Sequence, residues 1–327
     1  MFWWPLLVLA TPLAECGGAT VADGGNAQVL AVGDVASIIV CNDEYVYWMG
    51  RPCDDGGVNF SFGGLYRTPV AGGASEFLSP SAGASMACDS QYLYFWDAAE
   101  RLSRLTLADA SVTTLTPPRV NMTGSIATDG NGVYWVDING AHTVVDAGIV
   151  DLVSTPADQG LAAGSDRIFF GFEKVDGDAG VMTVAVDGAA PTVSWSGLAP
   201  SGMTLSASDV WFLAETATGS TSLVRMPRDG GLGSTVVDEA GEETTYNNIA
   251  TDSVHVYWLR DYFSVGRATF GGEDVTTIFD STLIPQPLAH GFYGLTVDST
   301  GLYLGIAASF IPPSGPTTCG GLLKVPK

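Results

Sequence analysis

The chain repeats a short aromatic strand seven times, at intervals of about forty residues. Each copy has two bulky residues at its centre, as in YVYWMG from Tyr45, GVYWVD from Gly132 and HVYWLR from His255. The third residue of each copy serves as a marker, and the markers are Tyr47, Tyr94, Tyr134, Phe169, Trp211, Tyr257 and Tyr303. Their spacings of 47, 40, 35, 42, 46 and 46 residues average just under 43. Such a period indicates one structural unit per repeat, packed on its neighbours.

Each repeat carries further strand signals around its marker. A small or branched residue stands seven positions before the marker, and an Asp, Asn, Ser or Gly stands five before it. A second strand follows (LYRTPVAGG, LSRLTLADA, LVRMPRDGG), and then a third (SVTTLT, STVVD, VTTIF). The alternation has period two, with no 3.6-residue helical pattern. We therefore predict an all-β chain, a seven-bladed β-propeller of four-stranded blades, forming a single domain over residues 27–327.

The two ends of the repeat array complement each other. The last unit stops at Lys327 after its third strand, and Ala27–Ala31 is an unassigned strand before the first complete unit. If this N-terminal strand completes the last blade, the ring closes without an unpaired edge, which removes a site of unwanted strand pairing.

The pattern of a small residue, any residue, Asp, four residues and Tyr-Trp resembles the YWTD repeat of extracellular propellers. It is still more similar to the Tyr-Trp propeller repeats of bacterial cell-surface lipoproteins. The clearest matches are IATDGNGVYWVD (Ile126–Asp137) and IATDSVHVYWLRD (Ile249–Asp261). The resemblance implies a fold and no activity. The chain departs from it in two ways, because three units lack the Asp and seven units replace the six of YWTD propellers.

The N-terminus predicts export. Residues 2–14 form an uncharged apolar stretch of 13, too short for a bilayer span of about 20 residues and typical of a signal peptide over residues 1–15. Leu13-Ala14-Glu15-Cys16 resembles a lipoprotein lipobox, although Glu15 departs from it and no Lys or Arg precedes Arg51. We expect Cys16 to be acylated and residues 16–26 to form a tether. The chain would then be a bacterial outer-membrane or cell-surface lipoprotein; with a plain signal cut near Ala14 it would be periplasmic or secreted.

Charge excludes several partner classes. Thirteen Lys+Arg against 35 Asp+Glu leaves a net charge of −22. Nucleic-acid binding and adsorption to anionic lipid both need clustered cations, so neither is expected. We expect a monomer that meets the membrane only through its lipid anchor.

The repeated acidic residues, Asp89, Asp129, Asp252 and Asp298, allow two interpretations. They could form a metal-binding ring, but an Asp just before a turn also accepts the backbone N–H groups of that turn, and we favour this structural role. The Tyr-Trp pairs are interpreted as packing between blades. Calcium at Asp176-Gly177-Asp178 is the one cofactor worth weighing, but the loop lacks a further acidic ligand, so a turn is favoured and no cofactor is expected.

Two functional hypotheses remain. The chain has no G-x-S-x-G, P-loop or H-E-x-x-H motif, and His occurs only at positions 142, 255 and 290. We favour a non-enzymatic binding or scaffold propeller, with a protein or carbohydrate at its loop-rich face and channel mouth. The alternative is a hydrolase or lyase acting on a sugar or lactone, with loop carboxylates such as Asp261, Glu173 and Asp280 as acid and base. The unrepeated loop residues selected as ligand contacts are Arg51, Phe60, Tyr246, Arg260, Tyr262, His290, Tyr293 and Phe310.

Four cysteines remain besides Cys16, an even number in a chain expected to be exported. Cys53 and Cys319 both follow the marker strand, in the first and last units, which ring closure makes neighbours. We predict that they form a disulfide across the seam. Cys41 and Cys88 occupy equivalent positions in adjacent units and are either bridged or paired buried thiols.

Overall fold

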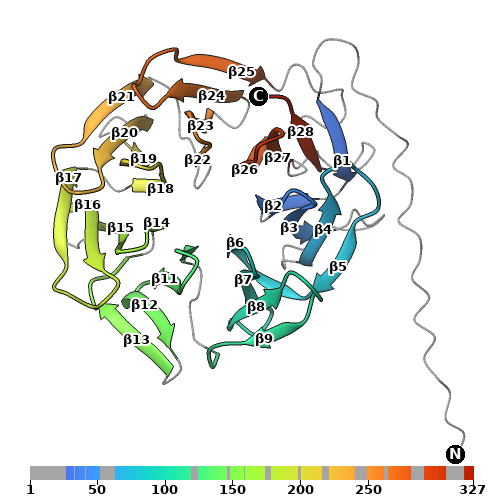
Figure 1. Cartoon of the computed structure of the whole chain (residues 1–327), viewed down its shortest axis with the longest axis horizontal. Coiled ribbons are helices and arrows are strands. Elements are labelled where there is room, and N and C mark those ends of the chain that lie inside the picture. The colour runs from blue at the N-terminus through green and yellow to red at the C-terminus, as the bar shows by residue number, and fades with distance from the viewer. Residues whose placement is uncertain are drawn as a thin grey trace, which may run out of the picture.

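The repeated strands fold into seven four-stranded antiparallel sheets, arranged as a ring in the computed structural model (Figure 1). This arrangement confirms the predicted seven-bladed propeller. The structure describes residues 27–32, 34–40, 42–51, 63–118, 124–145, 148–157, 159–173, 178–197, 200–215, 221–239, 249–260, 264–280, 291–306 and 320–327.

Blades are numbered along the chain, and in blades 1 to 6 four consecutive strands form one sheet. Blades 1 to 3 comprise β2 (Asp34–Val40), β3 (Tyr45–Arg51), β4 (Gly64–Pro69), β5 (Glu76–Ser79); β6 (Ser81–Cys88), β7 (Tyr92–Asp97), β8 (Leu102–Thr106), β9 (Val112–Thr114); β10 (Ile126–Thr128), β11 (Val133–Asp137), β12 (Gly140–Val145) and β13 (Gly148–Val153).

The later blades follow the same order. Blades 4 to 6 comprise β14 (Gln159–Ala163), β15 (Arg167–Glu173), β16 (Ala179–Ala185), β17 (Thr192–Gly197); β18 (Pro200–Leu205), β19 (Asp209–Glu215), β20 (Thr221–Pro227), β21 (Ser234–Glu239); β22 (Ile249–Thr251), β23 (His255–Arg260), β24 (Ser264–Thr269) and β25 (Thr276–Asp280). Blade 7 comprises β26 (Phe292–Val297), β27 (Leu302–Ile306), β28 (Gly321–Val325) and, from the N-terminal end, β1 (Gln28–Val32).

Blade 7 closes the ring with strands from both ends of the array. Its order is β1-β28-β27-β26, and β1 runs antiparallel to β28 with Gln28 opposite Lys324 and Val32 opposite Gly321. The closure predicted for Ala27–Ala31 is therefore confirmed, with the strand displaced by one residue.

The aromatic pair of each marker strand packs between blades because successive side chains of a strand point to opposite faces of its sheet. Tyr47 joins an apolar cluster that blade 1 shares with Phe95 of blade 2. The next residue, Trp48, joins the cluster that blade 1 shares with Tyr303 of blade 7. The seven buried clusters each join two neighbouring blades. The core is thus a ring of interfaces, which confirms the packing role predicted for these aromatics.

The first strand of each blade lies nearest the central axis (Figure 1). Small residues there face the marker across the strand pair, as Ala87 faces Tyr94 and Ala127 faces Tyr134. In blade 1 the register differs by one, because Ile39 rather than Val40 lies opposite Tyr47. The last pair of β2 and β3, Val40 with Val46, encloses five residues, whereas the last pair in blade 3, Thr128 with Val133, encloses four, and this additional residue shifts the pairing.

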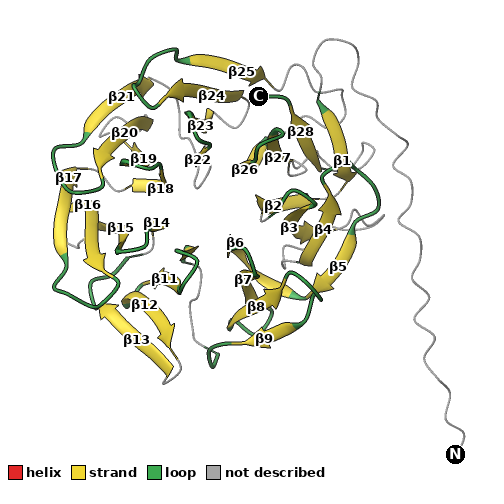
Figure 2. Ribbon diagram, in the orientation of Figure 1, coloured by secondary structure: helices red, strands yellow, loops and turns green. Residues whose placement is uncertain are grey.

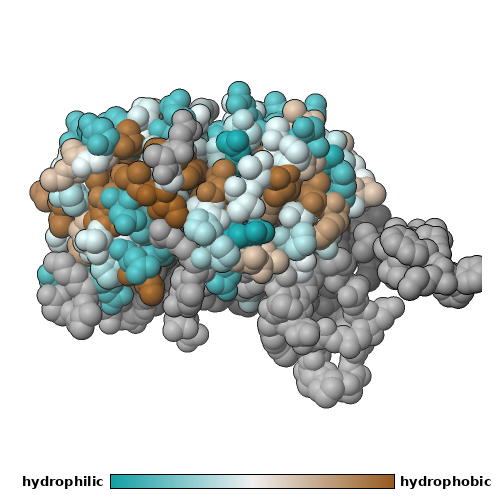
Figure 3. All heavy atoms as spheres, turned by 90° about the horizontal axis from the view of Figure 1, so that it is seen from below, coloured by the Kyte–Doolittle hydropathy of each residue, from teal (hydrophilic) through white to brown (hydrophobic). Residues whose placement is uncertain are grey.

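Because the strands of each blade alternate in direction, the connections lie on two opposite faces of the ring; Figure 2 shows the described turns and loops in green. We call one end the turn face: it holds the first turns, which join the first and second strands (residues 41–44, 89–91, 129–132, 164–166, 206–208, 252–254 and 298–301), and the turns between the third and fourth strands. The other end is the loop face, with the connections from second to third strand and from each blade to the next. On the rim, apolar and polar side chains are mixed (Figure 3). Within the described residues, no helix has the length and apolarity to cross a membrane.

Candidate functional site

Three of the eight loop residues selected from the sequence lie in described strands, at the strand ends that meet the loop face. Arg260 ends β23 in blade 6, Tyr293 lies in β26 of blade 7, and Arg51 ends β3 in blade 1. Because blade 7 lies between blades 6 and 1, the fold places all three in one sector of the face. Phe60, Tyr246, Tyr262, His290 and Phe310 lie outside the described residues.

The described members of this sector offer polar and aromatic surface. Nη1 of Arg260 donates a hydrogen bond to Oγ1 of Thr277, 2.8 Å away, so the guanidinium lies against the outer strand of its own blade. The Tyr293 side chain is 45% exposed. An exposed aromatic on an innermost strand gives this sector a contact surface beside the central axis.

The loop carboxylates of the hydrolase hypothesis do not form a described pair. Glu173 ends β15 in blade 4, and Asp280 ends β25, the outer strand of blade 6. Blade 5 lies between them, so these two carboxylates are not brought together. Asp261 lies outside the described residues.

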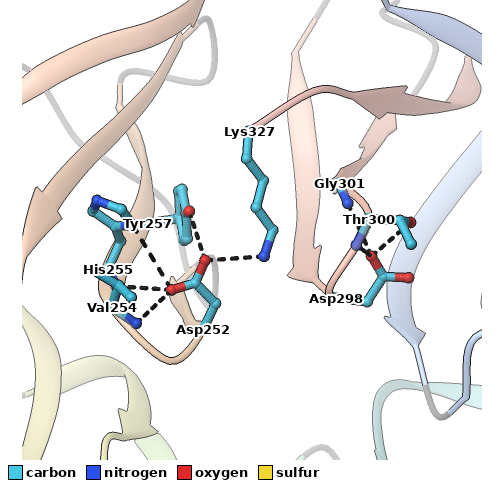
Figure 4. Close-up of polar contacts among 8 residues, drawn as sticks. All are labelled: Asp252, Val254, His255, Tyr257, Asp298, Thr300, Gly301 and Lys327. Atoms are coloured by element: carbon cyan, nitrogen blue, oxygen red, sulfur yellow. Dashed lines mark hydrogen bonds and ion pairs between the residues drawn. The ribbon is translucent and has the colours of Figure 1, made fainter.

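On the turn face, the repeated aspartates organise the first turns. Asp252 Oδ1 accepts hydrogen bonds from the backbone N–H groups of Val254 and His255, both at 2.8 Å. Its Oδ2 accepts the hydroxyl of the marker Tyr257 at 2.9 Å (Figure 4). Asp89, Asp129 and Asp298 repeat this arrangement in blades 2, 3 and 7. The predicted turn-capping role is confirmed, whereas the bond to the tyrosine was missed.

These pairs alter acid–base behaviour. Burial, together with the neighbouring Asp129 carboxylate, raises the pKa of the Tyr134 hydroxyl to about 12. Burial and the Asp298 carboxylate likewise raise the pKa of the Tyr303 hydroxyl to about 12, although its hydrogen bond with Thr300 acts to lower it. Partial burial of Asp252 acts to raise its pKa, but the hydrogen bonds from two backbone N–H groups, Lys327 and Tyr257 outweigh it and lower that pKa. The pKa of Asp298 is lowered in the same way by its hydrogen bonds, so these two carboxylates are held in the charged form.

One aspartate–tyrosine pair also receives an ammonium group. Nζ of Lys327 lies 2.9 Å from Asp252 Oδ2, and Figure 4 shows it reaching from blade 7 to the first turn of blade 6. Both side chains are largely buried, with 24% of Lys327 and 14% of Asp252 exposed. Nothing in the sequence marks this partnership, because the two residues are 75 positions apart.

Blade 4 organises the equivalent turn with a cation from its neighbour. Its repeat has Gly164 in place of the Asp, and a Cβ at this position would overlap Nη2 of Arg228. Arg228 follows β20 of blade 5, and its Nη1 donates to the carbonyl of Ser206 at 3.4 Å. Arg167 of blade 4 donates in turn to the carbonyl of Arg228 at 3.4 Å. Nη2 of Arg228 also lies 3.9 Å from Oδ1 of Asp166 in this turn, so contacts between blades 4 and 5 occupy the space beside Gly164.

Five of the thirteen basic residues occupy one repeated position on the third strand, opposite the marker: Arg67, Arg104, Arg225, Arg267 and Lys324. Several lie over aromatic rings, as Arg104 does over Tyr92 at 4.5 Å and Arg67 over Tyr45 at 4.6 Å. The sequence reasoning missed this role, although LYR, LSR, LVR, VGR and LLK carry the signal.

A buried histidine links three strands of blade 3. Nδ1 of His142 lies 2.7 Å from Asp151 Oδ1 and Nε2 lies 3.0 Å from Asp137 Oδ1, while Trp135 stacks on the ring. The His142 side chain is 2% exposed, so this network braces β11, β12 and β13 and offers no surface for a ligand.

Metal and cysteine predictions fall largely outside the described residues. Asp176 and Gly177 of the weighed calcium loop lie outside them, as do Cys16, Cys41, Cys53 and Cys319. Cys88 ends β6 and is half-buried. Across the part of the chain that the structure describes, no three His, Cys, Asp or Glu side chains gather as metal ligands. Both disulfides stay predictions.

Comparison with known proteins adds information on the fold. A scan against protein-family models and a search of curated proteins both find no match. Among solved structures, that of U3-55K aligns with a TM-score of 0.67 and 13% identity over 92% of this chain and 98% of that chain. YCF48 bound to D1 peptide aligns with a TM-score of 0.59 and 11% identity over 93% and 95%.

A bacterial surface protein is similar as well. PorZ, a component of the type-IX secretion system of Porphyromonas gingivalis, aligns with a TM-score of 0.61 and 16% identity over 91% of this chain and 39% of that chain. The likeness to all three is one of fold. These neighbours serve different purposes, and a shared fold assigns no activity by itself.

Proposed function

We propose that this chain is an exported binding or scaffold propeller that holds a protein partner at the blade 6, 7 and 1 sector of its loop face. The observation that carries the proposal is the distribution of connection lengths. Twelve residues separate β3 from β4, eleven separate β25 from β26, and fourteen separate β27 from β28. All three connections join strand ends of this sector, which also contains Arg51, Arg260 and Tyr293. They include the two longest connections of the loop face, and outside the sector only the connection from β9 to β10 is as long as eleven residues.

The contrast with the opposite face supports the assignment. Each first turn of the turn face has only three or four residues. Long connections on a rigid scaffold are where binding residues concentrate. Propellers of similar fold hold partners in solved structures, as YCF48 does with D1 peptide.

Site-specific photocrosslinking tests the partner. A photoreactive phenylalanine analogue replaces Tyr293 in the producing cell, and a matched variant carries it at Val193, which is 51% exposed on the outer strand of blade 4. We expect one discrete protein adduct from position 293 and none from position 193. Equal adducts from both positions, or none from either, would overturn the proposal.

We propose further that Cys16 anchors the chain to the cell envelope. The support is the lipobox-like Leu13-Ala14-Glu15-Cys16 and the Gly-rich stretch after it. A Cys16→Ser variant should move to the soluble fraction and lose labelling by a fatty-acid precursor. If parent and variant are equally soluble and unlabelled, the anchor is wrong and an ordinary signal peptide replaces it.

A further inference from the structure

The first turns form an acidic ring around the central axis. They contain seven carboxylates, one or more in six of the seven blades, and no Lys or Arg in their own sequence. These carboxylates are Asp43, Glu44, Asp89, Asp129, Asp166, Asp252 and Asp298. The turn face is therefore complementary in charge to a cationic partner.

Four of these carboxylates share one acceptor geometry. We call each aspartate–tyrosine pair an ammonium notch: Asp89 with Tyr94, Asp129 with Tyr134, Asp252 with Tyr257, and Asp298 with Tyr303. A carboxylate has about four acceptor sites. In each notch Oδ1 accepts two N–H groups and Oδ2 accepts the tyrosine hydroxyl. One acceptor site on Oδ2 is left over in each notch.

The Asp252 notch shows which group fits that remaining site. There the acceptor is filled by Nζ of Lys327 at 2.9 Å, a primary ammonium brought from another blade. Lys327 occupies this acceptor site although another cation, Arg267, already lies opposite Tyr257 on the neighbouring strand. Asp89 and Asp129 are half-buried, and among the described residues no Lys or Arg side chain pairs with either of them, so no described cation of this chain fills the remaining acceptor site of their notches.

We propose that the turn face docks a lysine-bearing segment of a partner protein, whose ammonium groups enter the notches of blades 2 and 3 as Lys327 enters that of blade 6. This second surface does not rest on the loop-face proposal.

Fluorescence anisotropy with labelled hexalysine tests the proposal. The test variant combines Asp89→Asn with Asp129→Asn, and the chain itself shows that Asn supports this turn, because Asn42 Oδ1 accepts the N–H groups of Glu44 and Tyr45. The control combines Asp109→Asn with Asp274→Asn, two exposed carboxylates in outer turns of the same face. Both variants change the net charge from −22 to −20.

We expect the test variant to weaken hexalysine binding about tenfold and the control less than about twofold, since each lost charge-assisted bond is worth about a factor of ten or less. Lys327→Ala should strengthen binding about threefold, because it opens the Asp252 notch. Equal weakening in the test and control variants would show a general effect of net charge and would overturn the proposal that ammonium groups bind in the notches.

A competition arm separates a protein segment from a polyamine, which carries the same ammonium group. Spermidine is titrated against bound hexalysine. Displacement only at concentrations well above that of unlabelled hexalysine supports a protein segment, whereas displacement at lower concentrations overturns that assignment in favour of a polyamine. A failed crosslink at Tyr293 bears on the loop face alone and leaves these readouts unaffected.

Discussion

Blades 4 and 6 build the same turn with different side chains. In blade 6, Asp252 caps its own turn, holds Tyr257 and receives Lys327. In blade 4, Gly164 leaves space that Arg228 of blade 5 fills, beside a marker, Phe169, that has no hydroxyl. In blade 6 a carboxylate accepts the N–H groups of its own turn and a lysine of blade 7, whereas in blade 4 a guanidinium from blade 5 occupies the space beside Gly164.

The difference shows that the repeat conserves a shape while the chemistry that supports it varies. The Asp252 carboxylate caps its own turn and also contacts Lys327 of blade 7, whereas the Arg228 contact couples blades 4 and 5 at a turn without a capping carboxylate. Substitutions in the two blades should therefore differ in size, in pH dependence and in coupling.

The largest effect is expected from Asp252→Ala. It leaves the exposed N–H group of Val254, the part-buried N–H group of His255 and the Tyr257 hydroxyl without their acceptor, at a cost of about 2–3 kcal/mol in free energy of unfolding. Asp252→Asn should cost less, because Asn42 performs the backbone part of this role in blade 1. Urea unfolding measures both, and equal losses would show that charge alone matters.

Acid should affect the aspartate blades first. The pKa of Asp252 and of Asp298 is lowered in the folded state by their hydrogen bonds, which outweigh partial burial. Their contribution is complete above the ordinary aspartate pKa of about 4 and is lost as the pH falls below it. Between pH 5 and 2, Asp252→Asn should therefore lose less stability than the parent, while Gly164→Ala should follow the parent. Parallel pH curves for all three would contradict this.

Coupling is expected in blade 4. Gly164→Ala places a Cβ against Nη2 of Arg228, which must move, and Arg228→Ala removes that contact. We expect the double variant to be more stable than the sum of the single losses predicts, by about 0.5–1 kcal/mol. A double-mutant cycle by chemical denaturation measures this. Strict additivity would mean that Arg228 does not occupy the Gly164 space.

The last comparison concerns the marker hydroxyl, where one of two opposite substitutions should have no stabilising effect. Tyr257→Phe removes one hydrogen bond to Asp252 and should cost about 1 kcal/mol. Phe169→Tyr adds a hydroxyl where Gly164 offers no carboxylate, so it should bring no gain in the melting temperature. A stabilised Phe169→Tyr variant would show that blade 4 contains an acceptor other than an aspartate.

Much of the ring could be predicted from the sequence because the repeat is one unit in the same environment seven times. The marker spacing gave the blade number, and Asp before a turn has a local role that needs no tertiary information. The register of Ile39 opposite Tyr47 was missed, since one additional turn residue shifts a strand pair without leaving a clear pattern.

The contacts between blades were harder to foresee. The partnership of Lys327 with Asp252 and the entry of Arg228 beside Gly164 depend on how neighbouring sheets are rotated, and residue spacing does not encode this. The third-strand cations were accessible in principle, because their period matches the markers. For the loop residues predicted as ligand contacts, the structure gives positions only. Arg51, Arg260 and Tyr293 lie in one sector, and their role as ligand contacts stays a prediction.

The pairing of β1 with β28 has a consequence in time. Gln28 is synthesised nearly three hundred residues before its partner Lys324. Six blades can form from adjacent segments as they emerge, but the seventh must wait for the end of the array while β1 stays unpaired. Contacts so distant in sequence form slowly. A nascent chain that lacks Gly321–Val325 is therefore an open arc with two exposed ends, and only β28 turns it into a ring.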